Sequence, residues 1–352
     1  MPVIQAIATA VPPHVLAQED IRDAALHHFS RGRRDMRRLI PIFDNVNVKT
    51  RHLCVPLQWY DSRHSFTDTN GEYIRWARKL GRQAAQECLQ RAGRSPGDVD
   101  HLIFVSTSGL STPSIDAHLI NEMGFDAHVR RTPVFGLGCA GGAAGLSRLL
   151  DLSRVPGQGC VLLVSVELCS LTFQFHDFSK ANLVASSLFS DGAAAVLVCS
   201  GSQANGARCP RIVASHSTLW PDTMDVMGWD FSEHGLGVIF SRRIPTLIGD
   251  RIRDNIAQFL ERQGLGLSDL SHFLVHPGGA KILQVLAEVL ELKEEQLAHS
   301  RWVLENYGNM SSPTLLFILE RFQRLSNPRK GDYGLAAAFG PGFSSELILL
   351  QW

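Results

Sequence analysis

The sequence predicts an α/β protein made of two related halves. Short apolar runs rich in β-branched residues alternate with stretches of helical periodicity, a pattern typical of strands that helices cover on both faces. The same order of elements begins again after a polar, glycine-containing segment at residues 200–208. The length of 352 residues also suits two domains of ordinary size. We therefore expect an N-terminal half at residues 1–205 and a C-terminal half at residues 206–352.

The first half is expected to open with helices and to continue as a sheet. Helices are predicted over residues 20–40 and 72–93 from their apolar periodicity. Four apolar runs then predict buried strands, and a stretch of helical pattern at residues 140–155 separates the second from the third. These strands are predicted over residues 101–106, 133–137, 159–166 and 193–199.

The second half is expected to repeat this scheme with longer helices. Strands are predicted where apolar runs are short, and helices where the apolar residues recur every three or four positions. Together with the first half, they predict two related sheets with helices between and around them. The predicted strands are residues 211–215, 272–275, 335–339 and 346–350, and the predicted helices are residues 245–263, 279–290 and 312–325.

The charge balance and the apolar content exclude several classes of protein. The chain has 34 lysines and arginines against 34 acidic residues, and 45% of its residues are hydrophobic. A nucleic-acid-binding protein would normally have a basic surplus. The first residues lack the cationic region of a secretory signal, and no apolar run approaches the roughly 20 residues of a membrane span. We expect a soluble cytoplasmic protein with no nucleic-acid partner.

The seven cysteines favour a reducing compartment. Their number is odd, and no two of them form a Cys-x-x-Cys pair. This pattern argues against both a disulfide framework and a zinc site. We expect neither a metal nor another cofactor.

One cysteine differs from the others in its setting. Cys139 follows Gly138 at the predicted change from strand to helix, and small residues begin the helix. The sulfur would lie at a helix N-terminus, where free N–H groups and the helix dipole favour a thiolate. The flanking glycines allow a tight turn and the close approach of a substrate carbonyl. Cys139 is therefore the candidate nucleophile, whereas Cys160 and Cys199 are expected to be buried structural residues.

Two polar residues at other element junctions complete a candidate site. His276 ends an apolar run, and the Pro-Gly-Gly sequence that follows it should end the strand. The His276 side chain would then lie at the strand end where ligands bind in α/β sheets. Asn309 lies in a loop before the predicted helix at residues 312–325, and its amide can donate a hydrogen bond without titrating. Taken singly, a core histidine and a turn asparagine remain open alternatives.

Together, these segments resemble those of the type III polyketide synthases, the chalcone and stilbene synthase family of the thiolase superfamily. The resemblance runs through nearly the whole chain and implies the thiolase fold, a layered αβαβα core. It also implies an acyltransferase whose substrates are an acyl-CoA starter and malonyl-CoA. The matching motifs are Gly-Leu-Gly-Cys139, His276-Pro-Gly-Gly, Gly-Asn309-Met-Ser-Ser, Leu-Phe189-Ser-Asp-Gly-Ala and Phe339-Gly-Pro-Gly342.

The resemblance implies a role for each member of the set. Cys139 would carry the acyl group, while His276 and Asn309 would bind the thioester carbonyl oxygen of malonyl-CoA. After loss of CO2, these two donors would stabilise the enolate, which would attack the acyl group in a Claisen condensation. His276 would also hold the sulfur as a thiolate.

Further positions of the family's reaction cavity match this sequence. Phe189 matches a gatekeeper between the CoA tunnel and the cavity, whereas Val238 stands where plant enzymes have a second gatekeeper phenylalanine. Val238 and the small Cys169 predict a larger apolar pocket and, as in similar bacterial members, a medium- or long-chain fatty acyl-CoA starter that yields an alkylpyrone or alkylresorcinol. The implied cavity residues are Phe189, Thr107, Cys169, Thr172, Val238, Ser311, Phe339, Gly340, Pro341 and Gly342.

The resemblance also implies how CoA and a second copy of the chain bind. Only Arg38 matches the family's basic contacts to the CoA phosphates. The other four arginines between residues 31 and 38 either compensate for the missing contacts or form an exposed basic helix face. Thr112-Pro113 matches a loop that crosses a dimer interface. We therefore expect a homodimer and a cis bond before Pro113.

Two alternative functions remain open. An initiating ketoacyl-carrier-protein synthase would share the fold and the Cys-His-Asn set, but it would take malonate from a carrier protein and condense once. A non-catalytic binding protein on the same fold would be expected to lack one of the three residues. The segment Phe339–Gly342 and the chain length favour the polyketide synthase. The sequence leaves open the starter, the number of extensions and the mode of ring closure.

Overall fold

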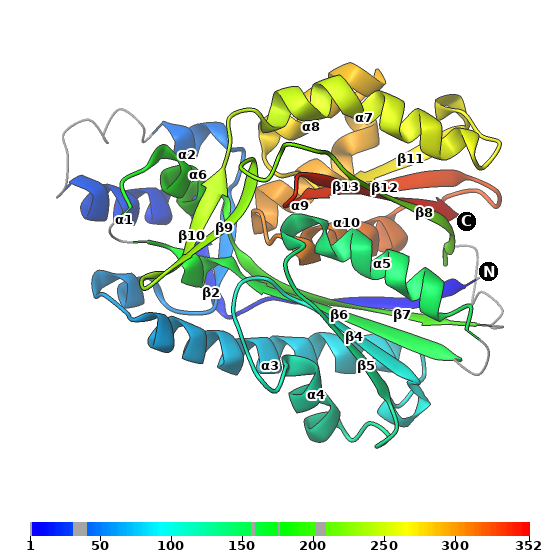
Figure 1. Ribbon diagram of the computed structural model, residues 1–352, viewed down its shortest axis with the longest axis horizontal. Helices are drawn as coiled ribbons and strands as arrows, with labels where there is room; N and C mark the ends of the chain where they lie inside the picture. The colour runs from blue at the N-terminus through cyan, green and yellow to red at the C-terminus, as the bar shows by residue number, and fades with distance from the viewer. Residues whose placement is uncertain (1, 31–40, 156–158, 175–176, 201–208) are drawn as a thin grey trace.

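A nine-stranded sheet forms the centre of the protein (Figure 1). The computed structural model describes residues 2–30, 41–155, 159–174, 177–200 and 209–352. The strands follow the order β11-β12-β13-β8-β1-β7-β6-β4-β5 across the sheet. Their bounds are β1 Val3–Ala10, β4 His101–Val105, β5 Arg130–Val134, β6 Cys160–Leu168, β7 Asp191–Cys199, β8 Arg211–Leu219, β11 Leu270–Val275, β12 Tyr333–Gly340 and β13 Ser344–Gln351.

Helices lie between and outside the two parts of this sheet, which gives the αβαβα layers of the thiolase fold. The helices α5 (Gly141–Leu152) and α10 (Ser312–Leu325) lie between the β8–β13 part and the β1–β7 part (Figure 1). Outside, α3 (Phe66–Arg91) and α4 (Ile115–Met123) cover one part, while α7 (Ile244–Glu261) and α8 (Ala280–Leu290) cover the other. The predicted fold class is confirmed.

The two related sheets that the sequence predicted are continuous with each other, because β1 joins them. β1 pairs with β7 along most of its length and meets β8 only at Val3 and Arg211. Two backbone bonds complete this junction, from Ile4 N to the Pro210 carbonyl and from Ile212 N to the Pro2 carbonyl. The alanine-rich β1 has a weak strand signal, which is why the sequence pattern did not reveal the junction. The division expected near residue 205 lies outside the described residues.

The predicted helices agree with the structure to different degrees. α10 spans the predicted residues 312–325. α3 begins at Phe66 rather than at residue 72, because Ser65 and Asp68 form a capping box ahead of it. The helix predicted over residues 20–40 is observed as α1 (Gln18–Ser30), and its remaining part lies outside the described residues.

Several short elements near the site were not predicted. They have few residues each, so their apolar periodicity is too brief to distinguish them from loops. The structure also places the hairpin of β9 and β10 beside α6 (Figure 1). These elements are β2 (His14–Ala17), β3 (Thr50–Leu53), α2 (Ile42–Asn45), α6 (Lys180–Leu188), β9 (Met227–Ser232), β10 (Gly235–Phe240) and α9 (Ala298–Tyr307).

Two of the seven cysteines are paired, which corrects the expectation that none would be. Cys160 begins β6 and Cys199 ends β7, and the two residues face each other in the antiparallel register. Their sulfur atoms form a disulfide across a sequence separation of 39 residues. Only the strand pairing brings the two together, so their spacing in the sequence carried no signal. The other five cysteines are free thiols.

The described part of the chain contains no helix that is long and apolar enough to cross a membrane. The longest of the described helices, α3, has 26 residues, but only one of its faces is apolar. Exposed arginines such as Arg75 and Arg82 lie on the opposite face. Amphipathicity of this kind is typical of a helix that covers a sheet.

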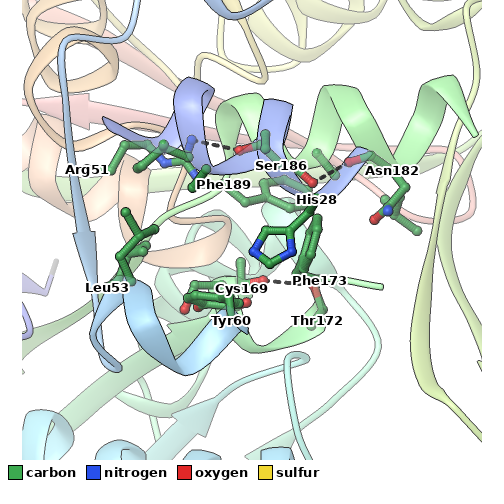
Figure 2. Close-up of a pocket in the computed structure, with 17 residues that line it drawn as sticks. His28, Arg51, Leu53, Tyr60, Cys169, Thr172, Phe173, Asn182, Ser186 and Phe189 are labelled. Carbon is green, nitrogen blue, oxygen red and sulfur yellow. Dashed lines mark hydrogen bonds between the residues drawn. The ribbon is translucent and has the colours of Figure 1, made fainter. Parts of the chain in front are cut away.

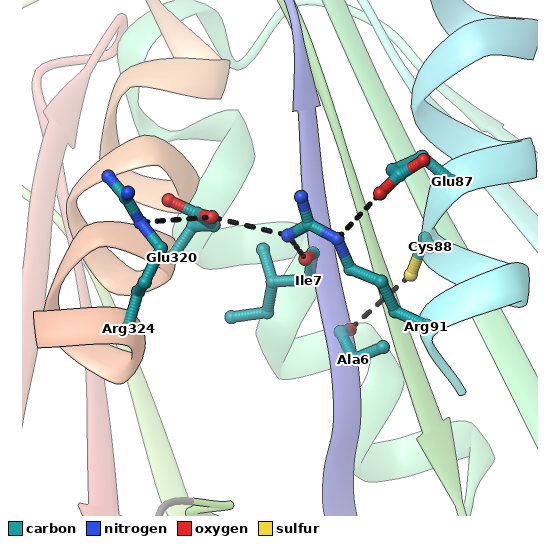
Figure 3. Close-up of polar contacts among 7 residues, drawn as sticks. All are labelled: Ala6, Ile7, Glu87, Cys88, Arg91, Glu320 and Arg324. Carbon is teal, nitrogen blue, oxygen red and sulfur yellow. Dashed lines mark hydrogen bonds and ion pairs between the residues drawn. The ribbon is translucent and has the colours of Figure 1, made fainter.

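Arg91, the last residue of α3, connects the two halves of the chain (Figure 3). Its guanidinium donates to the Ile7 carbonyl in β1 at 2.7 Å and to Glu320 in α10 at 3.2 Å. A third bond, at 2.9 Å, runs to Glu87 within α3. Because the Arg91 side chain is about 43% exposed, water screens these charges and each bond contributes modestly.

Replacing Arg91 with methionine should lower the free energy of unfolding by about 1 kcal/mol. Urea denaturation of the two proteins measures the difference. Arg148→Met is the matched control, because Arg148 pairs with Asp151 within α5 and both side chains are half exposed. It should cost less than about 0.5 kcal/mol. A loss for Arg91→Met no greater than that of the control would contradict the connecting role.

Candidate active site

The three candidate residues meet in one narrow cavity. Cys139 lies in a 3-10 turn, Gly138–Ala140, immediately before α5. His276 directly follows β11, and Asn309 lies between α9 and α10. All three side chains line the same cavity, whose other walls are mainly apolar. The structure therefore brings together three segments that are far apart in the sequence.

The Cys139 turn is packed tightly against the loop between β12 and β13. Gly138 has a φ of +46°, and a Cβ at this position would lie 2.9 Å from the Cδ of Pro341. Gly340 approaches so closely that its own Cβ would lie 2.5 Å from a carbonyl oxygen of the turn. Only glycine fits these two positions without displacing the turn. The Gly340–Pro341 loop thus fixes the place of the nucleophile.

The backbone of Asn309 joins the two halves of the chain at the cavity. Its N–H donates to the Leu188 carbonyl at 2.8 Å, and its carbonyl accepts from Ser190 N at 2.9 Å. These bonds form an isolated parallel bridge between Asn309 and Phe189. Phe189 and Asn309 are consequently held side by side, although 120 residues separate them.

The side chain of Asn309 is also fixed. Its Oδ1 accepts from Ser311 N at 2.7 Å, and its Nδ2 donates to the Gly278 carbonyl at 3.2 Å. Gly278 belongs to the loop that follows His276, so this bond sets the distance between the two donors. An asparagine amide has two N–H groups. The side chain also bonds to the Cys139 sulfur, a place where a ligand oxygen could accept the second N–H instead.

His276 is buried and its ring has no fixed partner. Its exposed fraction is 1%, and neither ring nitrogen has a hydrogen-bond partner among the described residues. Burial lowers the pKa of His276 to about 3, because desolvation disfavours the charged imidazolium. A neutral imidazole can donate through one nitrogen and accept through the other.

The thiol of Cys139 is neutral in this cavity. Burial raises the pKa of Cys139 to about 11, and the charge of Glu167 raises it further, while hydrogen bonds from Ser311 and Asn309 oppose the rise. Desolvation thus opposes the thiolate that the sequence analysis expected from the position before α5. Forming the thiolate therefore requires a base that takes its proton.

Glu167 is a buried carboxylate that the sequence analysis did not assign to the site. It lies in β6 and accepts hydrogen bonds from Thr107 N at 3.0 Å and from Ser312 Oγ at 2.9 Å. Burial raises the pKa of Glu167 to about 7. The sequence could have pointed to Glu167, because it is an acidic residue inside an apolar strand. A buried acidic group needs hydrogen-bond partners or has a function.

The predicted cavity residues fall into three places. Phe189 and Val238 line both the Cys139 cavity and a larger pocket, whereas Cys169 and Thr172 line the larger pocket (Figure 2). Ser311, Phe339 and Pro341 face the Cys139 cavities, while Thr107 supports the turn by accepting from Gly138 N. Gly340 packs against the Cys139 turn, Gly342 lies against Leu219, and Arg38 lies outside the described residues.

Trp229 lines the Cys139 cavity together with Val238. The two residues face each other in the β9–β10 hairpin, and Trp229 lines the second cavity beside Cys139. Its ring centroid lies 6.0 Å from that of Phe189, at an interplanar angle of 59°. Because this hairpin was not predicted, the sequence carried no usable signal for Trp229.

Comparison with known proteins identifies the family. Residues 1–202 match the N-terminal domain of chalcone and stilbene synthases, and residues 211–352 match the C-terminal domain of the same enzymes. The chain belongs to the chalcone and stilbene synthase family. Both matched regions include the expected motifs, so the alternative of a ketoacyl-carrier-protein synthase is not favoured.

Individual relatives point to the bacterial members of this family. The chain is 40% identical to a candidate chalcone synthase of Bacillus subtilis (strain 168), over 100% of this chain and 99% of that protein. It is 38% identical to the 1,3,6,8-tetrahydroxynaphthalene synthase of Streptomyces peucetius subsp. caesius, over 99% and 93% of the two chains. A crystal structure of the 1,3,6,8-tetrahydroxynaphthalene synthase from Streptomyces coelicolor A3(2), a bacterial type III polyketide synthase, is also similar. It matches with a TM-score of 0.94 and 31% sequence identity, over 100% of this chain and 99% of that chain. The protein is thus a type III polyketide synthase, an acyltransferase.

Changing Glu167 to glutamine should make Cys139 more reactive. The substitution removes a negative charge that raises the pKa of the thiol, so alkylation by iodoacetamide should become about threefold faster at alkaline pH. The difference should vanish well below pH 7, because Glu167 is then protonated in the unchanged enzyme.

Glu346→Gln is the matched control for this measurement. Glu346 is a second buried carboxylate with a raised pKa, but it bonds to Ser217 in β8 and does not act on Cys139. Its replacement should leave the alkylation rate unchanged. A Glu167→Gln rate equal to that of the control at every pH would show that the carboxylate has no electrostatic effect on the sulfur.

Proposed function

We propose that this enzyme transfers a medium- or long-chain fatty acyl group from CoA to Cys139, extends it with malonyl-CoA and releases an alkylpyrone or alkylresorcinol. The observation that carries the proposal is the convergence of Cys139, His276 and Asn309 in one buried cavity. An apolar pocket adjoins this cavity at Phe189 and Val238. The two spaces separate the chemistry from the place where an acyl chain would lie.

In the loading step, the proton of the Cys139 thiol moves to His276. Both groups are neutral beforehand, so the transfer creates a thiolate and an imidazolium beside each other. The sulfur attacks the carbonyl carbon of the acyl-CoA, and the bond from that carbon to the CoA sulfur breaks. The CoA thiolate takes the proton from His276, which returns the imidazole to its neutral form.

In the extension step, the thioester oxygen of malonyl-CoA accepts from His276 and from the second N–H of Asn309. When CO2 leaves, the electron pair of the broken carbon–carbon bond stays with the thioester and forms an enolate. The two donors stabilise the negative charge on the enolate oxygen. The enolate carbon then forms a bond to the acyl carbon as the bond to the Cys139 sulfur breaks. This step frees the Cys139 thiolate and leaves the extended chain as a thioester of CoA. The thiolate can then take up that chain for another cycle.

The adjoining pocket suits an apolar chain. Most of its wall consists of aliphatic and aromatic side chains from α1, β3 and the segment after β6 (Figure 2). Burying methylene groups against such a wall is favourable by about 0.8 kcal/mol each. We assign this pocket to the starter chain, and we assign Arg38 and its neighbouring arginines to the CoA phosphates.

An exposed apolar patch supports the proposal of a homodimer. Leu110 is 40% exposed and lies two residues before the cis bond between Thr112 and Pro113. Phe135 and Phe231 are more than half exposed, and their ring centroids lie 6.5 Å apart. Exposed aromatic rings that lie close together favour burial against another chain, and a second copy of this chain is the partner we propose.

A second candidate is a product made from malonyl units alone. Trp229 narrows the cavity beside Cys139, which favours a compact aromatic product over a chain with a long alkyl tail. A relative with 38% identity is named as a 1,3,6,8-tetrahydroxynaphthalene synthase. Incubation with malonyl-CoA, without and with acyl-CoAs of graded length, distinguishes the two candidates through the masses of the products.

Cys139→Ala should abolish product formation from malonyl-CoA with every acyl-CoA tested. Without the sulfur no acyl group can be held for attack by the enolate. Cys88→Ala is a suitable control, because Cys88 is a buried cysteine of α3 whose thiol donates to the Ala6 carbonyl. Mass spectrometry of the products decides the outcome, and any polyketide formed by Cys139→Ala would refute the assigned nucleophile.

The size of the starter should depend on the Val238–Trp229 pair. Val238→Phe adds volume where the two spaces meet and should shift the preferred starter to shorter chains, whereas Trp229→Ala should shift it to longer ones. The measurement is kcat/KM for acyl-CoAs of graded length. Unchanged use of palmitoyl-CoA by both variants would contradict the assignment of the pocket.

A further inference from the structure

We propose that Arg51 and Gln18 are positioning residues for the reaction. By holding the C-terminal turn of α6, they place Phe189 and Asn309 beside Cys139. The effect on catalysis rests on the proposed function of Asn309, whereas the positioning itself rests on contacts that are independent of the substrate. Neither residue touches Cys139 or His276 in the described contacts.

The last turn of α6 has carbonyl groups that its own helix cannot satisfy. The final helical bond runs from Phe189 N to the Ala185 carbonyl at 2.8 Å. After it, the chain leaves the helix in an extended conformation, so the next three carbonyls need donors from elsewhere. These donors are Arg51 Nη1 to Ser186 O at 2.8 Å, Gln18 Nε2 to Ser187 O at 2.8 Å and Asn309 N to Leu188 O at 2.8 Å.

The third of these bonds belongs to the bridge that carries the active site. Arg51, Gln18 and Asn309 therefore hold consecutive carbonyls of one turn, and the first two fix the direction in which Leu188 O points. Gln18 also accepts from Arg51 at 3.3 Å, which links the two side chains. A shift of this turn would move the Leu188 carbonyl away from Asn309 N.

Arg51 is a buried cation without an ion pair among the described residues. Its exposed fraction is 3%, and burial lowers its pKa to about 10, so it remains charged at neutral pH. An unpaired buried charge is costly, but the end of a helix carries a partial negative charge that favours a cation. The bond to Ser186 O places the guanidinium at that end of α6 (Figure 2).

The rest of β3 supports the same segment. His52 N donates to Ser190 Oγ at 2.8 Å, and Cys54 N, just after the strand, donates to Asp191 Oδ2 at 2.7 Å. On the other side of the bridge, a Cβ at Gly308 would lie 3.1 Å from the Cδ of Arg51. Arg51 thus packs against both chain segments that form the Phe189–Asn309 bridge.

Loss of Arg51 should affect the two half-reactions differently. Asn309 stabilises the developing enolate in the proposed extension step, so its displacement should lower kcat more than it changes KM for malonyl-CoA. Alkylation of Cys139 by iodoacetamide does not need Asn309 to bind a substrate oxygen and should change little. A general loss of stability would change both kcat and the alkylation rate of Cys139, so it can be distinguished from the proposed effect.

The test compares Arg51→Met and Arg51→Lys with Arg91→Met. Arg91 also donates to a backbone carbonyl between elements, but it has no contact with the site. We expect Arg51→Met to lower kcat about tenfold or more, with KM for malonyl-CoA and the alkylation rate within about twofold of the unchanged enzyme. Arg51→Lys should recover part of the loss because it keeps a cation at the helix end, and Arg91→Met should keep kcat within about twofold.

Hydrogen exchange of the Asn309 and Ser190 amides tests the positioning without reference to the reaction. Both should exchange faster in Arg51→Met and not in Arg91→Met. If the unchanged enzyme made no polyketide, the proposed function would fail while this exchange would still decide the positioning. Unchanged exchange in Arg51→Met, or a kcat equal to that of Arg91→Met, would overturn the proposal. If Arg51→Met does not fold, Arg51→Lys and Gln18→Leu are measured by the same criteria.

Discussion

The short backbone pairing of Phe189 with Asn309 is the interaction on which the active site depends. It joins the segment after α6, in the first half of the chain, to the loop before α10, in the second half. Phe189 then lies where the two cavities meet, and the Asn309 amide is tied to the loop that follows His276. Breaking the pairing would leave two buried backbone groups without partners and would separate the donors from the nucleophile.

Burial sets the electrostatics of this site. It raises the pKa of Cys139 to about 11 and lowers that of His276 to about 3, so the resting groups are neutral. A buried cavity strengthens each hydrogen bond to a developing enolate and limits its contact with water. The same burial opposes the thiolate, and the proposed transfer of a proton from Cys139 to His276 reconciles the two requirements, because the charges then appear as an adjacent pair.

The fold class and the three converging residues could be predicted because local patterns reveal them. Apolar runs indicate buried strands, and the glycine-flanked Cys139, the Pro-Gly-Gly stop after His276 and the loop before α10 each mark an element junction. What depends on pairing between distant strands could not be predicted in this way. The disulfide of Cys160 and Cys199, the single continuous sheet and the packing of Trp229 against Phe189 all belong to this group, as do the contacts of Arg51 with α6.

The most direct test of the account is to locate the acyl group on the enzyme. The protein is incubated with a fatty acyl-CoA in the absence of malonyl-CoA, digested and analysed by mass spectrometry. The account predicts one acyl group per chain, on the peptide that contains Cys139, and its loss when malonyl-CoA is added. An acyl group on the peptide of Cys169 or of another free cysteine, or an acyl-Cys139 that persists with malonyl-CoA, would contradict it.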